Sequence, residues 1–182
     1  GKSSAVLESL NEGDDILDVC GPLGHATDIR KVGTVICVGG GTGIAAMHHI
    51  AKGHHLAGNR VVGIIGARSK DLLLFEKELK AFADEVLIAT DDGSYGRKGF
   101  VTTLLKERLE EDKNVAEVVA VGPVPMMAAV ADVTRPFGVK TTVSLNPIMV
   151  DGIGMCGACR VTVGGKTRFA CVDGPEFDGH QV

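Results

Sequence analysis

Aromatic residues are scarce in this sequence, which contains six Phe, one Tyr and no Trp among 182 residues. Proteins that bind single-stranded nucleic acid stack bases on aromatic side chains, so this shortage argues against that class. Basic residues are not in excess, and the formal net charge of −4 argues against a general nucleic-acid binder. The longest apolar stretch, residues 32–47, is interrupted by five glycines and is too short to span a bilayer.

A disulfide framework is not expected, because the five cysteines are an odd number and the polar first residues lack the pattern of a secretory signal. Three of them, Cys156, Cys159 and Cys171, lie close together near the C-terminal end. This grouping favours a cysteine-ligated metal site in a reducing compartment, and we expect a cytoplasmic protein. The sequence starts with Gly-Lys-Ser-Ser and no initiator Met, which suggests a fragment of a longer chain.

Hydrophobic patterning predicts an α/β fold. From residue 33 onwards, continuous apolar strands alternate with helical stretches, which is typical of a parallel sheet covered on both faces. We therefore predict a five-stranded parallel doubly wound sheet, followed by a small C-terminal loop and hairpin. The strands are expected at 34–38, 60–67, 85–90, 115–121 and 139–145, and the helices at 44–52, 71–82, 100–111 and 125–134.

The two ends of the chain have patterns of their own. Near the N-terminus, the apolar residues within 16–19 predict a short strand. Near the C-terminus, residues 160–163 and 166–170 flank a Gly-Gly pair, which is a hairpin signal. The residues after Cys171 are polar or rich in glycine, and we expect them to contribute little to a core.

A glycine-rich turn follows the first apolar strand directly and opens a helix. It contains the pattern G-x-G-x-x-A at Gly41, Gly43 and Ala46. In this context glycines let backbone amides approach a pyrophosphate, and a helix N-terminus favours its negative charge, so the sheet is expected to bind a dinucleotide. The alternative is a turn that binds nothing. The residues expected to contact the nucleotide here are Gly39, Gly40, Gly41, Thr42, Gly43 and Ile44.

Further contacts with the nucleotide are expected where the later strands end. The second strand is followed by Arg68 instead of an acidic residue, so Arg68 either faces an adenosine ribose or 2′-phosphate or is a solvated surface residue. Met126 begins the helix after the fourth strand, where packing is an alternative to a cofactor contact. The remaining expected contacts are Asp91, Asp92 and Gly93 after the third strand, and Gly122 and Pro123 after the fourth.

The three C-terminal cysteines share a metal-site spacing with an aspartate. Asp151-x4-Cys156-x2-Cys159-x11-Cys171 keeps the C-x4-C-x2-C spacing of plant-type [2Fe–2S] sites, with Asp151 at the first ligand position. The sequence therefore predicts a [2Fe–2S] cluster held by Asp151, Cys156, Cys159 and Cys171. The alternative is zinc, bound by the three thiolates together with Asp151 or His180.

The order of these motifs, preceded by Gly21, Pro22, Leu23 and Gly24, resembles the ferredoxin–NADP reductase superfamily, in particular its electron-transfer branch with a C-terminal [2Fe–2S] cluster. Within that branch the stretch 145–157, including Asp151, looks closest to the small subunits of NADH-dependent reduced ferredoxin:NADP oxidoreductase, also called sulfide dehydrogenase. The hydrogenase gamma (diaphorase) subunit and the electron-transfer subunit of dihydroorotate dehydrogenase B are further members. The resemblance adds Gly21, Pro22, Leu23 and Gly24 to the expected cofactor contacts.

Family members begin with a flavin-binding β-barrel, of which the resemblance leaves only the last strand here. It implies three parts: 1–32, the end of a truncated FAD-binding barrel with a linker; 33–145, an NAD(P)-binding domain; and 146–182, a [2Fe–2S]-binding extension. The full-length protein is expected to pass electrons between NAD(P)H, FAD and the [2Fe–2S] cluster, and to or from a catalytic partner subunit of a hetero-oligomeric oxidoreductase. No catalytic acid or base is assigned.

Several alternatives to this interpretation remain open. The subunit could serve dihydroorotate dehydrogenase B, or the chain could be a non-enzymatic nucleotide-binding module with a structural zinc site. The resemblance favours NAD(H), whereas Arg68 keeps NADP(H) open. Ferredoxin with NADP, polysulfide, protons and dihydroorotate are the alternatives for the partner's substrate.

Overall fold

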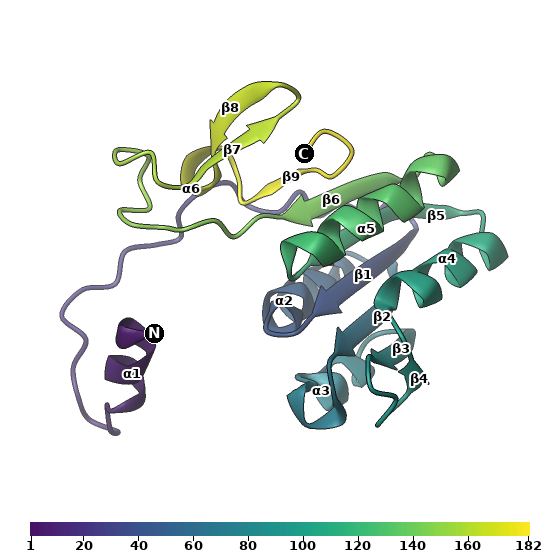
Figure 1. Cartoon of the computed structure of the whole chain (residues 1–182), viewed down its shortest axis with the longest axis horizontal. Helices are drawn as coiled ribbons and strands as arrows, with labels where there is room; N and C mark the ends of the chain where they lie inside the picture. Colours follow the sequence, from purple (N-terminus) through teal and green to yellow (C-terminus); the bar gives the residue numbers. More distant parts are fainter.

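The computed structural model describes all 182 residues and contains a seven-stranded sheet in the order β4-β3-β2-β1-β5-β6-β9 (Figure 1). Neighbouring strands pair in parallel, except that β9 runs antiparallel to β6 at one edge. The five predicted parallel strands are confirmed as β1, β2, β3, β5 and β6, and the short strands β4 and β9 extend the sheet at its two edges. The strands are β1 Thr34–Gly40, β2 Arg60–Ala67, β3 Glu85–Thr90, β4 Arg97–Lys98, β5 Val115–Val121, β6 Lys140–Ser144 and β9 Glu176–Asp178.

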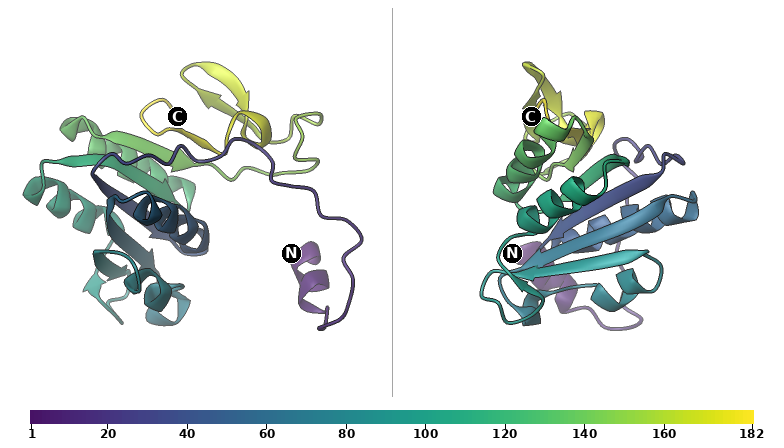
Figure 2. Two further views of the ribbon diagram at one scale, coloured as in Figure 1. Left: turned by 180° about the vertical axis from the view of Figure 1, so that it is seen from behind. Right: turned by 90° about the vertical axis from the view of Figure 1, so that its right-hand side faces the viewer.

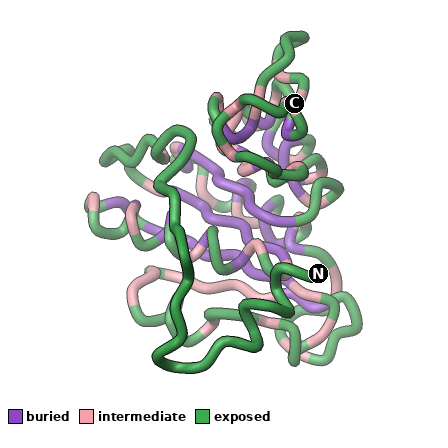
Figure 3. Tube along the Cα trace, turned by 90° about the vertical axis from the view of Figure 1, so that its left-hand side faces the viewer, coloured by how far each residue is buried: buried purple, intermediate pink, exposed green.

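Helices cover both faces of the sheet and bury a core on each side (Figures 2 and 3). One core cluster joins α4 and α5 to the strands, whereas the other joins α2 and Leu79 of α3 to the opposite face. Side chains of the strands alternate between the two clusters, with Ile36 in the first and Val35 in the second. No helix combines the length and apolar character needed to cross a membrane. The helices are α2 Gly43–Leu56, α3 Glu76–Lys80, α4 Val101–Glu111 and α5 Val124–Thr134, with 3₁₀ turns at Lys70–Leu72 and Arg135–Phe137.

The helix predicted for residues 71–82 is wrong in its first half. A 3₁₀ turn ends at Leu72, and α3 begins only at Glu76, after Phe75 adopts a left-handed conformation with φ +56°. The loop after β3 holds this segment, because Lys70 N–H donates to Ser94 Oγ at 2.9 Å and Tyr95 Oη donates to Glu76 Oε1 at 2.8 Å. Tertiary hydrogen bonds therefore override the helical pattern of the leucines.

The strand predicted at residues 16–19 is also wrong. The N-terminal part forms a helix, α1 Lys2–Glu8, and then runs as an irregular segment up to β1. Leu17 is 97% exposed and Val19 is 86% exposed, so the apolar residues of this segment face no core. Figure 1 shows α1 standing away from the sheet. A strand needs a neighbour that accepts its hydrogen bonds, and no neighbouring strand is present here.

The C-terminal extension contains the predicted hairpin and an additional strand. The hairpin strands β7 Arg160–Val163 and β8 Lys166–Phe169 pair around Gly164 and Gly165, which both have positive φ. A short helix, α6 Ala170–Asp173, leads into β9. Residues after Cys171 add only the partly buried Phe177 to the core, but they form the strand β9, which pairs with β6 and was not predicted.

Candidate nucleotide and iron–sulfur sites

The glycine-rich turn between β1 and α2 is open to solvent on one side. Gly41 has φ +55°, and a Cβ added there would meet no atom within 4 Å. On the inner side, a Cβ at Gly43 would lie 2.5 Å from the carbonyl oxygen of Val121, so only glycine fits. The amides of Gly41, Ile44 and Ala45 donate to backbone carbonyl oxygens, whereas those of Thr42 and Gly43 have no such partner. This turn therefore offers two donors and the positive end of the α2 dipole to an anion.

The segment after β5 lies directly against this turn. A Cβ at Gly40 would overlap Met126 Sδ and lie 3.2 Å from Pro123 Cδ. A Cβ at Gly122 would lie 2.8 Å from Met126 Cε and 3.1 Å from the carbonyl oxygen of Gly40. The structure therefore brings two of the predicted nucleotide segments together. Met126 packs between them, as expected from the packing alternative.

The ends of β2 and β3 bring Arg68 and the acidic loop together. The Asp91 amide donates to the Ala67 carbonyl oxygen at 3.1 Å, and the Asp92 amide donates to the Arg68 carbonyl oxygen at 3.2 Å. The Asp92 carboxylate accepts the Ser94 amide at 2.8 Å, and hydrogen bonds from the side chain and backbone of Ser94 lower the pKa of Asp92. The exposed side chains of Asp91 and Arg68 take part in no hydrogen bond or ion pair of the structure, so both are free to meet a ligand.

Two of the four predicted cluster ligands lie side by side, and the other two are joined through a backbone hydrogen bond. Cys159 and Cys171 are 2% and 8% exposed, and their Sγ atoms lie 3.2 Å apart. In the second pair, Asp151 Oδ2 accepts the amide of Cys156 at 2.6 Å. Its other oxygen, Oδ1, accepts the amide of Ile153 at 2.9 Å. The extension therefore arranges three sulfur donors and one oxygen donor around a loop rich in glycine.

Hydrogen bonds in this loop favour the charged form of two predicted ligands, Asp151 and Cys159. The amide of Ile153, followed by hydrogen bonds from Cys156, lowers the pKa of Asp151. The Cys171 amide donates to Cys159 Sγ at 3.4 Å, and this bond is the largest of the effects that lower the pKa of Cys159. Metal ligands of these types bind as carboxylate and thiolate, so these bonds favour the forms of Asp151 and Cys159 that a metal requires. The hydrogen bond to Cys159 raises the pKa of Cys171, so only one thiol of that pair is favoured as thiolate.

One close pair of donor atoms in the loop fits an iron of a two-iron cluster. No group of three His, Cys, Asp or Glu side chains in the chain converges on a single ion. Zinc sites need four donors on one ion, whereas a [2Fe–2S] cluster takes two protein ligands on each iron, and the adjacent Sγ atoms of Cys159 and Cys171 fit one such pair. His180, the alternative zinc ligand, lies elsewhere: its Nε2 is 2.9 Å from Thr134 Oγ1, at the end of β6 that is remote from the cysteine loop.

The segment Gly21–Gly24 lies against the iron–sulfur extension instead of the glycine-rich turn. The amide of His25 donates to the carbonyl oxygen of Gly174 at 2.8 Å. A Cβ at Gly152 would lie 3.0 Å from Leu23 Cδ1, so Leu23 contacts the loop that carries Asp151. The prediction that residues 21–24 contact a cofactor is not tested by these contacts, but they place the segment beside the cluster ligands.

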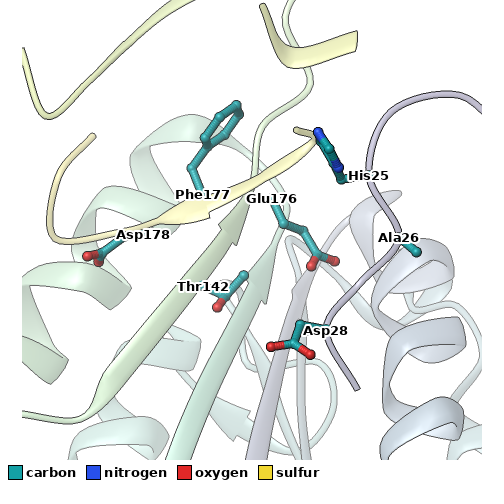
Figure 4. Close-up of a pocket in the computed structure, with 7 residues that line it drawn as sticks. All are labelled: His25, Ala26, Asp28, Thr142, Glu176, Phe177 and Asp178. Atoms are coloured by element: carbon teal, nitrogen blue, oxygen red, sulfur yellow. The ribbon is translucent and has the colours of Figure 1, made fainter. Parts of the chain in front are cut away.

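A cavity of about 220 Å³ continues this boundary between residues 25–28 and the β6–β9 edge (Figure 4). Thr27 Oγ1 donates to Glu176 Oε1 at 2.7 Å across it. Burial raises the pKa of Glu176, and the nearby Glu117 carboxylate raises it further. The sequence analysis missed Thr27 and Glu176, because a single Thr in a linker and a single Glu in a polar tail form no pattern. The cavity is lined by His25, Ala26, Asp28, Thr142, Glu176, Phe177 and Asp178.

Comparisons with known proteins agree with both halves of this arrangement. Residues 37–132 match the oxidoreductase NAD-binding domain, and residues 146–182 match the iron–sulfur cluster binding domain of dihydroorotate dehydrogenase B. A probable dihydroorotate dehydrogenase B (NAD(+)) electron transfer subunit of Thermococcus kodakarensis is 40% identical over the whole chain, which covers 73% of that protein. The chain belongs to this family of electron-transfer subunits.

Other members of the family are more similar in sequence. A dihydroorotate dehydrogenase B electron transfer subunit homolog of Thermotoga maritima is 52% identical over the whole chain, which covers 64% of that protein. A solved structure of the NADH-dependent reduced ferredoxin-NADP oxidoreductase is 50% identical with a TM-score of 0.90, over 100% of this chain and 65% of its own. The chain thus spans about two thirds of the length of these family members. The resemblance to the iron–sulfur electron-transfer branch of the ferredoxin reductases is confirmed.

Proposed function

We propose that this chain is the nucleotide-binding and iron–sulfur part of a subunit that transfers electrons between NAD(P)H, FAD and a [2Fe–2S] cluster. The observation that carries the proposal is the close pair of Cys159 and Cys171 sulfurs beside the loop of Asp151 and Cys156, in one chain with an open glycine-rich turn. Family membership supports it, because both domain types belong to oxidoreductases. The chain itself binds and orients, while its cofactors supply the redox chemistry.

The nucleotide is proposed to lie across the carboxyl ends of the parallel strands. Its pyrophosphate lies over residues 40–43 at the start of α2, where the unbonded amides of Thr42 and Gly43 and the helix dipole stabilise negative charge. Its nicotinamide lies beside Gly122 and Pro123, next to the turn. Hydride transfer between a nicotinamide and a flavin needs no general acid or base, so the residues of this site act by position alone.

We propose that the adenosine ribose meets Asp91. A dinucleotide site normally supplies an acidic residue from the end of the second strand, and this chain has Arg68 in that region. The hydrogen bonds between the ends of β2 and β3 place Asp91 beside Arg68, with a free carboxylate. A carboxylate accepts hydrogen bonds from ribose hydroxyls and repels a 2′-phosphate. This placement favours NAD(H) over NADP(H).

The iron–sulfur extension is proposed to hold one iron with Asp151 and Cys156 and the other with Cys159 and Cys171. A bound [2Fe–2S] cluster supplies one-electron chemistry. The amides that bind the Asp151 carboxylate keep this ligand ionised and fix its orientation. Because the three cysteine ligands must stay reduced, we infer a reducing, cytoplasmic environment for the protein.

The whole protein is proposed to act with a catalytic partner subunit, as the names of its relatives indicate for those proteins. We propose the division into residues 1–32, belonging with an FAD-binding barrel, residues 33–145, binding the nucleotide, and residues 146–182, binding the cluster. The 50% identity to the ferredoxin-NADP oxidoreductase favours a partner of that type. Dihydroorotate dehydrogenase B is the second candidate, favoured by the match of residues 146–182.

Anaerobic purification of the full-length protein, followed by visible absorption spectroscopy and analysis of iron, sulfide and zinc, tests the proposal. We expect two irons and two sulfides per chain. Stoichiometric zinc without iron or sulfide would refute it and would favour a nucleotide-binding module with a structural zinc site.

A further inference from the structure

The segment through which the chain enters the nucleotide-binding domain follows the iron–sulfur extension closely. Leu23 contacts Gly152, the amide of His25 bonds to the carbonyl oxygen of Gly174, and Thr27 bonds to Glu176. These contacts follow one another in chain order over residues 23–27. We call this line of contacts the seam.

Gly24 is the tightest point of the seam. It has φ +75°, and a Cβ added there would overlap the carbonyl oxygen of Gly174 and lie 3.4 Å from that of Cys171. Both obstacles are backbone atoms, which cannot rotate away as a flexible side chain does. Any side chain at position 24 therefore has to push the segment away from Cys171, a proposed ligand of the cluster.

The seam lies between the two parts of the chain that are proposed to carry the flavin and the cluster. Under the proposed function, residues before the seam belong to the flavin-carrying part, and residues 151–171 hold the cluster. The seam is therefore a direct protein contact between the carrier of the flavin and the loop of the cluster. Each transferred electron oxidises the reduced flavin and reduces one of the two ferric ions of the cluster to ferrous iron. The rate of such a transfer falls steeply with distance.

We propose that Gly24 is a positioning residue that sets the separation between the flavin and the cluster. This inference rests on the proposed function. Glycine at this position allows backbone-to-backbone contact between the entering segment and residues 171–174, and the hydrogen bonds of His25 and Thr27 hold that contact closed.

The test compares Gly24→Ala with Gly138→Ala in the full-length, cofactor-loaded protein. Gly138 has φ +65°, close to that of Gly24, but a Cβ there would meet nothing within 4 Å, so it controls for backbone strain alone. After mixing with NADH, stopped-flow absorbance separates reduction of the flavin from reduction of the cluster. Iron content, the EPR spectrum of the reduced cluster and hydrogen exchange at the His25 amide are measured in parallel.

We expect Gly24→Ala to slow cluster reduction severalfold, because the rate of electron transfer falls steeply with the separation of donor and acceptor. Flavin reduction, iron content and the EPR spectrum should match the wild type, and the His25 amide should exchange faster. If Gly24→Ala loses its cluster, the rate of cluster reduction is measured in Thr27→Val instead. This variant removes the hydrogen bond from Thr27 to Glu176 without adding bulk to the seam. It should slow the same step less.

Unchanged cluster reduction in Gly24→Ala with faster exchange at His25 would overturn the inference, as would equal slowing in Gly138→Ala. If Gly24→Ala loses its cluster, an unchanged rate of cluster reduction in Thr27→Val would also overturn the inference. These outcomes leave the proposed function intact. Absence of iron from the wild-type protein would instead remove the proposed function itself.

Discussion

The backbone amide of Asp91 donates a hydrogen bond to the carbonyl oxygen of Ala67, over 3.1 Å. This bond joins the end of β3 to the end of β2, where a dinucleotide-binding sheet meets the adenosine ribose. We propose that Asp91, after the neighbouring strand, supplies the carboxylate that this chain lacks after its second strand.

Asp91→Asn should weaken NADH binding and leave NADPH binding unchanged or tighter. Hydrogen bonds to a charged group contribute about 1.5–3 kcal/mol, so we expect the Kd of NADH to rise about tenfold or more. Titration of each nucleotide into the protein by calorimetry measures this. Asp132→Asn, on the exposed side of α5, controls for the loss of net charge. Equal weakening of both nucleotides by Asp91→Asn would contradict a contact with the ribose.

Gly41→Leu should block the pyrophosphate position. The site of its Cβ is empty, so a side chain fits but projects over the turn that is proposed to bind phosphate. Left-handed backbone costs any side chain about 1–2 kcal/mol of folding stability. Gly138→Leu carries the same cost far from the turn. We expect both variants to lower the thermal midpoint similarly and only Gly41→Leu to raise the Kd of NADH more than about tenfold. Unchanged affinity in Gly41→Leu would refute the pyrophosphate assignment.

The nucleotide half of the molecule was largely predictable from sequence. Buried parallel strands appear in the sequence as continuous apolar runs, and the turn at residues 39–43 is specified locally by its glycines. Local sequence patterns therefore predicted both the strands and the turn. The segment around Phe75 was not predictable in this way. Its backbone follows contacts with Ser94 and Tyr95 from a later loop, which no local pattern records.

Asp151 has two separable roles, in the fold of the loop and as a proposed ligand. Asp151→Asn keeps an oxygen that can accept the amides of Ile153 or Cys156 but removes the charge, whereas Asp151→Ala removes both. We expect both variants to lose iron on aerobic storage faster than the wild type, with Asp151→Ala the faster. Iron and sulfide analysis over time, with EPR of the reduced protein, measures this. Wild-type spectra and stability in both variants would mean that another group holds the iron.

Glu176→Gln should stabilise the protein at neutral and alkaline pH. Burial raises the pKa of Glu176 in the folded state, so the folded protein binds the proton more tightly than the unfolded chain. The resulting stability is full below the ordinary carboxyl pKa and is lost as the pH rises through the raised value.

The amide in Glu176→Gln removes this cost of ionisation and still accepts the hydroxyl of Thr27. We expect the thermal midpoint to rise by about 2 °C near pH 8, with a smaller gain near pH 5, since ~1 kcal/mol shifts the midpoint by about 2–4 °C at this length. Thermal unfolding at both pH values checks this. A gain that is equal at both would show that the carboxyl group does not titrate as its burial implies.

Strands at the two ends of the chain were not predictable from local sequence patterns. Leu17 and Val19 read as a strand, yet a strand forms only beside a partner, and these side chains are exposed. Phe177 is one apolar residue between two acids, too little to predict a strand, but β6 offers an open edge and Phe177 packs on the core. The ligand set stays a prediction: the spacing of Asp151, Cys156 and Cys159 lies within one loop, whereas Cys171 lies in α6 after the hairpin and meets Cys159 only in the folded chain.

The antiparallel pairing of β9 with β6 also bears on how the protein matures. The chain leaves the sheet after Ser144 and returns to the neighbouring edge position at Glu176, so the cysteine loop is closed at its base by strand hydrogen bonds. The sheet can therefore fold first, and the pairing of Ser144 with Glu176 then holds the two ends of the cysteine loop together. Iron and sulfide would then bind to a loop whose ends are already held by the folded sheet. Loss of the cluster would unfold this loop and leave the nucleotide-binding core folded.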